Sequence, residues 1–101
     1  MNTLTRLQDW YGKQCNGTWE HSWGVKIDTI DNPGWMVTID LRQTSYEKID
    51  FPKLERGDGD LDKDWIKCWT KDSSFRGIGD PSKLEEILDY FLVHIEASQA
   101  D

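Results

Sequence analysis

The sequence lacks a long apolar run, an apolar leader and any abundance of cysteine. Its longest unbroken apolar stretch spans residues 90–93, whereas about 20 apolar residues are needed to cross a bilayer. Arg6 and Asp9 lie within the first ten residues, where a signal peptide would carry its apolar region. We therefore expect a cytoplasmic protein in which Cys15 and Cys68 remain free thiols.

Positive charge is also scarce. The 101 residues include 12 Lys and Arg against 19 Asp and Glu, which gives a net charge of -7. Nucleic acid and anionic membranes repel such a chain, so neither is expected as a partner, whereas a basic protein suits it. Six Trp, three Tyr and three Phe add apolar area for a core. The length then predicts a single domain over residues 1–101.

The first half of the chain predicts a helix followed by a β-hairpin. Apolar residues recur at three- and four-residue spacing through residues 3–16, which indicates a helix. Strict alternation from Trp19 through Asp28 then predicts a half-buried strand. A turn follows at residues 31–34, which contain Pro33 and Gly34. Alternation resumes over residues 35–42, so residues 19–42 are predicted to form the hairpin.

The second half predicts two more strands and a final helix. A weaker strand is expected over residues 46–55, an acidic loop over 56–64, a strand over 65–71 and a loop over 72–80. The last helix is expected to begin with Asp80 as its cap. The order α-β-β-β-β-α predicts an α+β fold: an antiparallel sheet of about four strands with the N-terminal and C-terminal helices packed on one face.

No catalytic, metal or cofactor site is predicted. Alternate aspartates over residues 58–64 resemble a calcium loop, but Lys63 and Trp69 stand where that loop needs Gly and Glu. The two cysteines and two histidines lack the paired spacing of a zinc site. The Gly77-Ile78-Gly79 segment lacks the third glycine of a dinucleotide-binding loop and the lysine of a phosphate-binding loop.

Two interpretations of the remaining residues stay open. Aromatic side chains beside carboxylates are typical of protein interfaces, and Trp65 and Trp69 follow the acidic loop in that way. The alternative is a small enzyme or ligand-binding module with a Trp/Glu/His pocket. That pocket is built from Trp19, Glu20, His21 and Trp23.

Four motifs stand out along the chain. They are Leu7-Gln8-Asp9-Trp10-Tyr11, Trp19-Glu20-His21, Asp31-Asn32-Pro33-Gly34-Trp35 and Gly77-Ile78-Gly79-Asp80-Pro81. Together they resemble the immunity protein 53 family over nearly the whole chain. The resemblance implies a bacterial, cytoplasmic immunity protein, or antitoxin, that is encoded beside a polymorphic toxin gene. Such a protein binds its cognate toxin domain and blocks it, with no turnover of its own.

We hypothesise that acidic and aromatic residues form the toxin-binding surface. An inhibitory complex of this kind buries roughly 1,600 Å² around a few anchors. If the toxin is a basic nuclease, the carboxylates occupy its phosphate-binding cleft. Whether the protein alone is a monomer or a homodimer stays open. The hypothesis assigns contacts to Glu20, Asp40, Asp58, Asp60, Asp62, Trp65 and Trp69.

Overall fold

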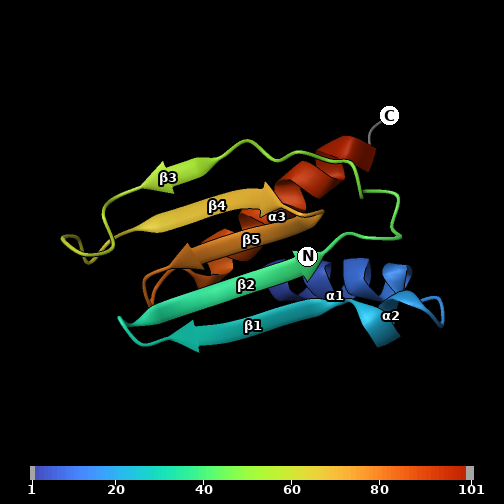
Figure 1. The fold of residues 1–101 in the computed structure, drawn as a ribbon, viewed down its shortest axis with the longest axis horizontal. Helices are drawn as coiled ribbons and strands as arrows, with labels where there is room; N and C mark the ends of the chain where they lie inside the picture. The colour runs from blue at the N-terminus through green and yellow to red at the C-terminus, as the bar shows by residue number, and fades with distance from the viewer. Residues whose placement is uncertain (1, 100–101) are drawn as a thin grey trace.

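The strand and helix patterns of the sequence assemble into one antiparallel sheet with helices on one side (Figure 1). The computed structural model describes residues 2–99. Its helices are α1 (Thr3–Gln14), α2 (Trp19–Ser22) and α3 (Leu84–Gln99). The sheet has the order β1-β2-β5-β4-β3. Its strands are β1 (Val25–Ile30), β2 (Gly34–Asp40), β3 (Leu54–Arg56), β4 (Ile66–Lys71) and β5 (Ser74–Gly79). The predicted α+β class is confirmed, with five strands in place of about four.

The apolar stripe of α3 forms the centre of the core. Its inward residues are at most 4% exposed, and they are Ile87, Leu88, Phe91, Leu92 and Ile95. The helix packs against β5, β2 and β4, and α1 packs against α3. The rings of Trp10 in α1 and Phe91 in α3 meet edge to face with their centroids 4.9 Å apart. Figure 1 shows both helices behind the sheet, so they cover the same face.

Alternation along the strands separates this covered face from an open one. On β2, Val37 and Ile39 are fully buried, whereas Met36, which points to the opposite side, is 40% exposed. The register places Met36 beside Ile78 of β5. The open face is therefore the side of the sheet that carries Met36 and Ile78, and it faces the viewer in Figure 1.

The predicted strand over residues 19–28 is wrong at its start. Trp19–Ser22 forms the short helix α2, and β1 begins only at Val25. A local turn is the cause. The Asn16 side chain accepts hydrogen bonds from two following backbone amides at 3.0 and 3.1 Å, and the Glu20 carboxylate accepts two more at 2.9 and 2.7 Å. Such side-chain bonds compete with strand pairing, so the hairpin consists of β1 and β2 alone.

The predicted loop over residues 72–80 is also wrong, because it contains β5 in the middle of the sheet. Gly77 and Gly79 indicated a loop, since glycine weakens a strand. In the structure, the absence of a side chain at these two glycines leaves room for residues of the α3 region. A Cβ added to Gly77 would lie 2.4 Å from Cγ2 of Ile87, and one added to Gly79 would lie 2.7 Å from Cβ of Lys83. Both glycines therefore let the α3 region lie directly on the sheet.

The predicted strand over residues 46–55 is mostly loop. Only Leu54–Arg56 pairs with β4. Phe51 packs into the core instead, with its ring 5.2 Å from Phe75 and 5.7 Å from Phe91. Pro52 next to it has no amide hydrogen to donate to a neighbouring strand. The strand predicted over residues 65–71 is confirmed as β4.

A glycine-to-alanine pair tests the close contact between β5 and α3. We expect Gly77→Ala to lower the free energy of unfolding by about 1–3 kcal/mol, because the new methyl group overlaps Ile87 in a packed core. Gly12→Ala is the control. Gly12 lies within α1 with nothing within 4 Å of an added Cβ, so this variant should gain about 0.5–1 kcal/mol. Urea denaturation followed by tryptophan fluorescence measures both, and equal stabilities would contradict the contact.

Candidate functional site

The structure places the predicted toxin contacts in three separate parts of the molecule. The loop between β3 and β4 lies at the same end of the sheet as the β1–β2 turn, and α2 lies at the other end (Figure 1). The strand register puts further predicted contacts on the open face. The loop carries Asp58, Asp60 and Asp62 and leads into Trp65, the open face carries Asp40 and Trp69, and α2 carries Glu20. The seven residues therefore do not form one surface, and the largest group is on the loop.

We call residues 57–64 and the turn residues 31–33 the acidic end. The loop is held by its own hydrogen bonds: the amides of Leu61 and Asp62 donate to the Asp58 carbonyl at 3.0 and 2.6 Å. The Asp62 carboxylate accepts from the Asp58 amide at 2.7 Å, and the Asp58 carboxylate accepts from the Asp60 amide at 2.9 Å. These bonds fix the backbone that presents three exposed carboxylates. Across residues 2–99, no ion pair neutralises any of the three.

Trp65 supports the acidic end from beneath. Its side chain is 5% exposed. Gly59 lies against its indole ring, since an added Cβ there would come within 3.4 Å of the ring. A hollow of about 480 Å³ separates the loop from the β1–β2 turn, with Trp65, Pro33 and Asp60 among its lining residues. Trp65 thus shapes the acidic end from inside and is not an exposed contact.

A buried carboxylate joins the acidic end to the start of α3. Asp80 is 3% exposed and accepts hydrogen bonds from the Trp65 amide at 2.9 Å and from the amide and hydroxyl of Ser82 at 2.8 and 2.6 Å. The Lys83 ammonium lies 2.9 Å from Asp80 and 2.6 Å from Asp64. Burial opposes ionisation of Asp80, but the hydrogen bonds from Ser82, Trp65 and Lys83 outweigh it and lower the pKa of this carboxyl.

This arrangement corrects the predicted start of the last helix. The helix begins at Leu84, and Asp80 instead holds the turn before it, with its carbonyl accepting from the Lys83 amide at 3.0 Å. The Asp80 amide also donates to the Trp65 carbonyl at 3.1 Å. Backbone and side chain of one residue therefore fix the position at which the acidic loop enters β4.

Two further residues of this region, Leu61 and Lys83, were not among the residues predicted from the sequence. Leu61 is 84% exposed, and its signal was available, since it is the one apolar residue in a run of charged ones. Lys83 bridges Asp64 and Asp80, two residues that no local spacing connects. The acidic end therefore includes an exposed apolar side chain and a buried cation that supports it.

The open face carries apolar side chains among charged ones. Trp69 is half-buried there, next to Arg76 of β5 in the register. Asp40 lies at the far end of β2, where its carboxylate accepts from the Arg42 amide at 3.0 Å and lies 3.9 Å from the Arg42 guanidinium. That guanidinium lies 4.8 Å from the centre of the Trp23 ring, in a cation–π contact. Asp40 is therefore already engaged within the chain.

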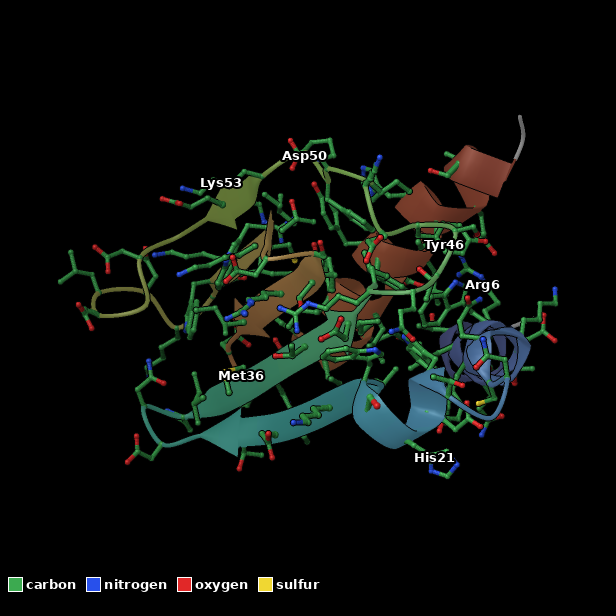
Figure 2. All side chains as sticks on the ribbon, turned by 45° about the vertical axis from the view of Figure 1, so that its right-hand side comes forward. Arg6, His21, Met36, Tyr46, Asp50 and Lys53 are labelled. Atoms are coloured by element: carbon green, nitrogen blue, oxygen red, sulfur yellow. The ribbon has the colours of Figure 1, made fainter. Side chains whose placement is uncertain are left out.

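The four residues of the alternative pocket do not converge. Trp19 is fully buried, and its indole donates to the Asp40 carbonyl at 3.2 Å. His21 is exposed and points away from the molecule (Figure 2). Glu20 and Trp23 alone share a groove of about 370 Å³, whose other lining residues come from α1 and the start of β1. Hydrogen bonds from backbone amides lower the pKa of Glu20, so this carboxylate serves the turn before α2.

In the described part of the chain, the cysteines and the other potential metal ligands do not form a reactive site. Both cysteines are free thiols, as predicted: Cys15 is exposed and Cys68 is buried. Burial raises the pKa of Cys68 to about 12, which keeps it protonated. Among the described residues, no three His, Cys, Asp or Glu side chains come together as metal ligands. No helix within residues 2–99 has both the length and the apolar character to cross a membrane.

Comparison with known proteins identifies the class and then the family. The class is that of immunity proteins: the model of immunity protein 53 matches residues 4–96. The chain therefore belongs to the immunity protein 53 family, and the resemblance seen in the sequence is confirmed. No curated protein and no solved structure matches it.

Because the pKa of Asp80 is lowered, the stability that Asp80 gives to the acidic end depends on pH. Its ordinary value is 3.8, so the ionised carboxylate stabilises the fold above about pH 4, and that contribution is lost as the pH falls. We expect Asp80→Asn to lower the free energy of unfolding by about 1–3 kcal/mol at pH 7. The difference from the parent should shrink below about pH 4.

Asp60→Asn is the control for this experiment, because Asp60 is exposed on the loop. It should change stability little at either pH. Urea denaturation at neutral and acid pH measures both variants. An Asp80→Asn deficit that stays constant down to pH 3 would show that the charge of Asp80 does not stabilise the fold.

Proposed function

We propose that this protein neutralises one cognate toxin domain by binding it in a stoichiometric complex, without turnover. Membership of the immunity protein 53 family supports the immunity role. The proposed mode of action depends on the carboxylates of the acidic end, whose backbone is held in place by hydrogen bonds. Asp60 and Asp62 flank Leu61 in the sequence, the Leu61 amide donates to the Asp58 carbonyl at 3.0 Å, and Leu61 is 84% exposed. An exposed apolar side chain beside carboxylates fits a basic cleft on an enzyme.

The charge of the loop explains how such binding would block the toxin. A cleft that binds phosphate groups is lined by cations, and it attracts carboxylates in the same way. In the proposed complex with a basic nuclease, the three aspartates take the positions of phosphates, and Leu61 excludes water from the contact. The internal hydrogen bonds of the loop reduce the entropy that is lost when the loop is immobilised on its partner.

The other predicted contacts have lesser parts in this proposal. Trp69 lies four residues beyond Trp65, which is about 13 Å along a strand, so an interface centred on the loop reaches it only at its rim. Asp40 lies at the other end of β2, where Arg42 engages it. Glu20 serves the turn before α2. We therefore centre the interface on Asp58, Asp60, Leu61 and Asp62.

Neutralising the three loop carboxylates tests the proposal. We expect Asp58→Asn/Asp60→Asn/Asp62→Asn to weaken toxin binding by about tenfold or more, chiefly through a slower association rate, and to flatten its salt dependence. Survival of cells that express the neighbouring toxin domain should fall in parallel. Calorimetry and stopped-flow kinetics with the purified toxin domain measure the binding.

A second triple variant with the same change in charge is the matched control. Asp9, Glu47 and Asp72 are exposed and lie outside the acidic end. Asp9→Asn/Glu47→Gln/Asp72→Asn should keep most of the affinity and protection. Equal losses in the two triple variants would mean that net charge alone matters. Full affinity of the loop variant would remove the acidic end from the interface.

A further inference from the structure

Among the residues that the structure describes, β1 is an edge strand: it pairs with β2 on one side, and no strand lies on its other side. The Asp40 amide donates to the Gly24 carbonyl at 3.0 Å, and the register continues from there to the pair of Val25 and Ile39. Hydrogen-bonded pairs alternate with non-bonded ones in an antiparallel ladder. The amides and carbonyls of Val25, Ile27 and Thr29 therefore point away from β2, at the edge of the sheet.

The two edges of the sheet are not alike. β3 has only three residues, follows Pro52 closely, and carries charged side chains paired to neighbours, such as Arg56 with Glu86 at 2.7 Å. Short length, charge and proline are the usual means of preventing strand addition. β1 has six residues and no proline, its two charged residues Lys26 and Asp28 are of opposite sign, and its Ile27 side chain is 40% exposed. β1 is thus the edge that is open to a further strand.

We propose that the β1 strands of two copies of this chain pair antiparallel about a two-fold axis at Ile27, joining the two sheets into one of ten strands. This register places Ile27 opposite Ile27 of the second copy and Val25 opposite Thr29. Each of the three residues with outward backbone groups then meets another such residue, so all of these groups can form hydrogen bonds.

Charge complementarity selects this register. It places Lys26 opposite Asp28 of the second copy, and the symmetry repeats the pair. Both side chains are exposed and lie on the open face, where their cross-strand neighbours on β2 are the uncharged Thr38 and Met36. The adjacent registers with the same backbone pairing are centred on Lys26 or Asp28 and set like charges directly opposite, which is unfavourable. The strand is therefore complementary to itself in one register.

The proposed pairing leaves the acidic end accessible. A two-fold axis through an antiparallel pair of strands turns the second sheet end for end, so the acidic ends of the two copies point in opposite directions. Each copy then presents its own loop, and the dimer neither requires nor blocks the interface proposed above. Its test needs no toxin, so the two proposals fail separately.

Charge exchange at the two positions tests the pairing. Lys26→Asp and Asp28→Lys each set like charges opposite one another, and we expect each to weaken self-association by about tenfold or more. The double variant restores both pairs with their signs exchanged, so it should dimerise like the parent. An equimolar mixture of the two single variants should form a heterodimer, because two carboxylates on one chain would then face two ammonium groups on the other. Sedimentation velocity over concentrations into the hundreds of micromolar measures all five samples.

Lys71→Asp is the matched control, since Lys71 is an exposed residue at the end of β4, away from β1. It should dimerise like the parent. The mixture also guards against misfolding, because only folded single variants can restore the dimer. A parent that stays monomeric throughout would overturn the proposal. So would single variants that dimerise as well as the parent, because another surface would then hold the copies together.

Discussion

The contact between Gly77 of β5 and Ile87 of α3 is the constraint on which the rest of the structure depends. A side chain at position 77 would collide with Ile87, so its absence lets α3 lie directly on the central strand. The helix then covers one face of the sheet, and α1 packs on the helix. Because both helices lie on that side (Figure 1), no helix within residues 2–99 covers the opposite face.

The same region of the chain supports the acidic end. Immediately after β5, Asp80 is buried against Trp65 and Lys83. A buried carboxylate is stable only with donors of this kind around it. The loop with its exposed carboxylates therefore rests on a base that is buried and hydrogen-bonded. Core packing and the proposed interface are linked through one short segment.

Elements with one buried face could be predicted from the sequence, because their apolar residues recur at a regular spacing. Alternation predicted β2, and the apolar stripe predicted α3, because each depends on residues close together in the chain. β5 was missed because the role of Gly77 depends on Ile87 in another element. The run of aspartates located the loop, but not the support from Asp80, fifteen residues from its partner Trp65. The alternation that began at Trp19 predicted a strand wrongly, because hydrogen bonds from side chains to the backbone of the preceding turn favour the short helix α2 there.

In the proposed complex, the acidic end is the surface that meets the toxin. Amide hydrogen exchange of the chain, alone and mixed with its cognate toxin domain, tests this most directly. We expect slowed exchange at residues 57–64 and at the β1–β2 turn, with exchange in the groove beside α2 unchanged. Protection confined to that groove, or no change anywhere while cells still survive the toxin, would contradict it.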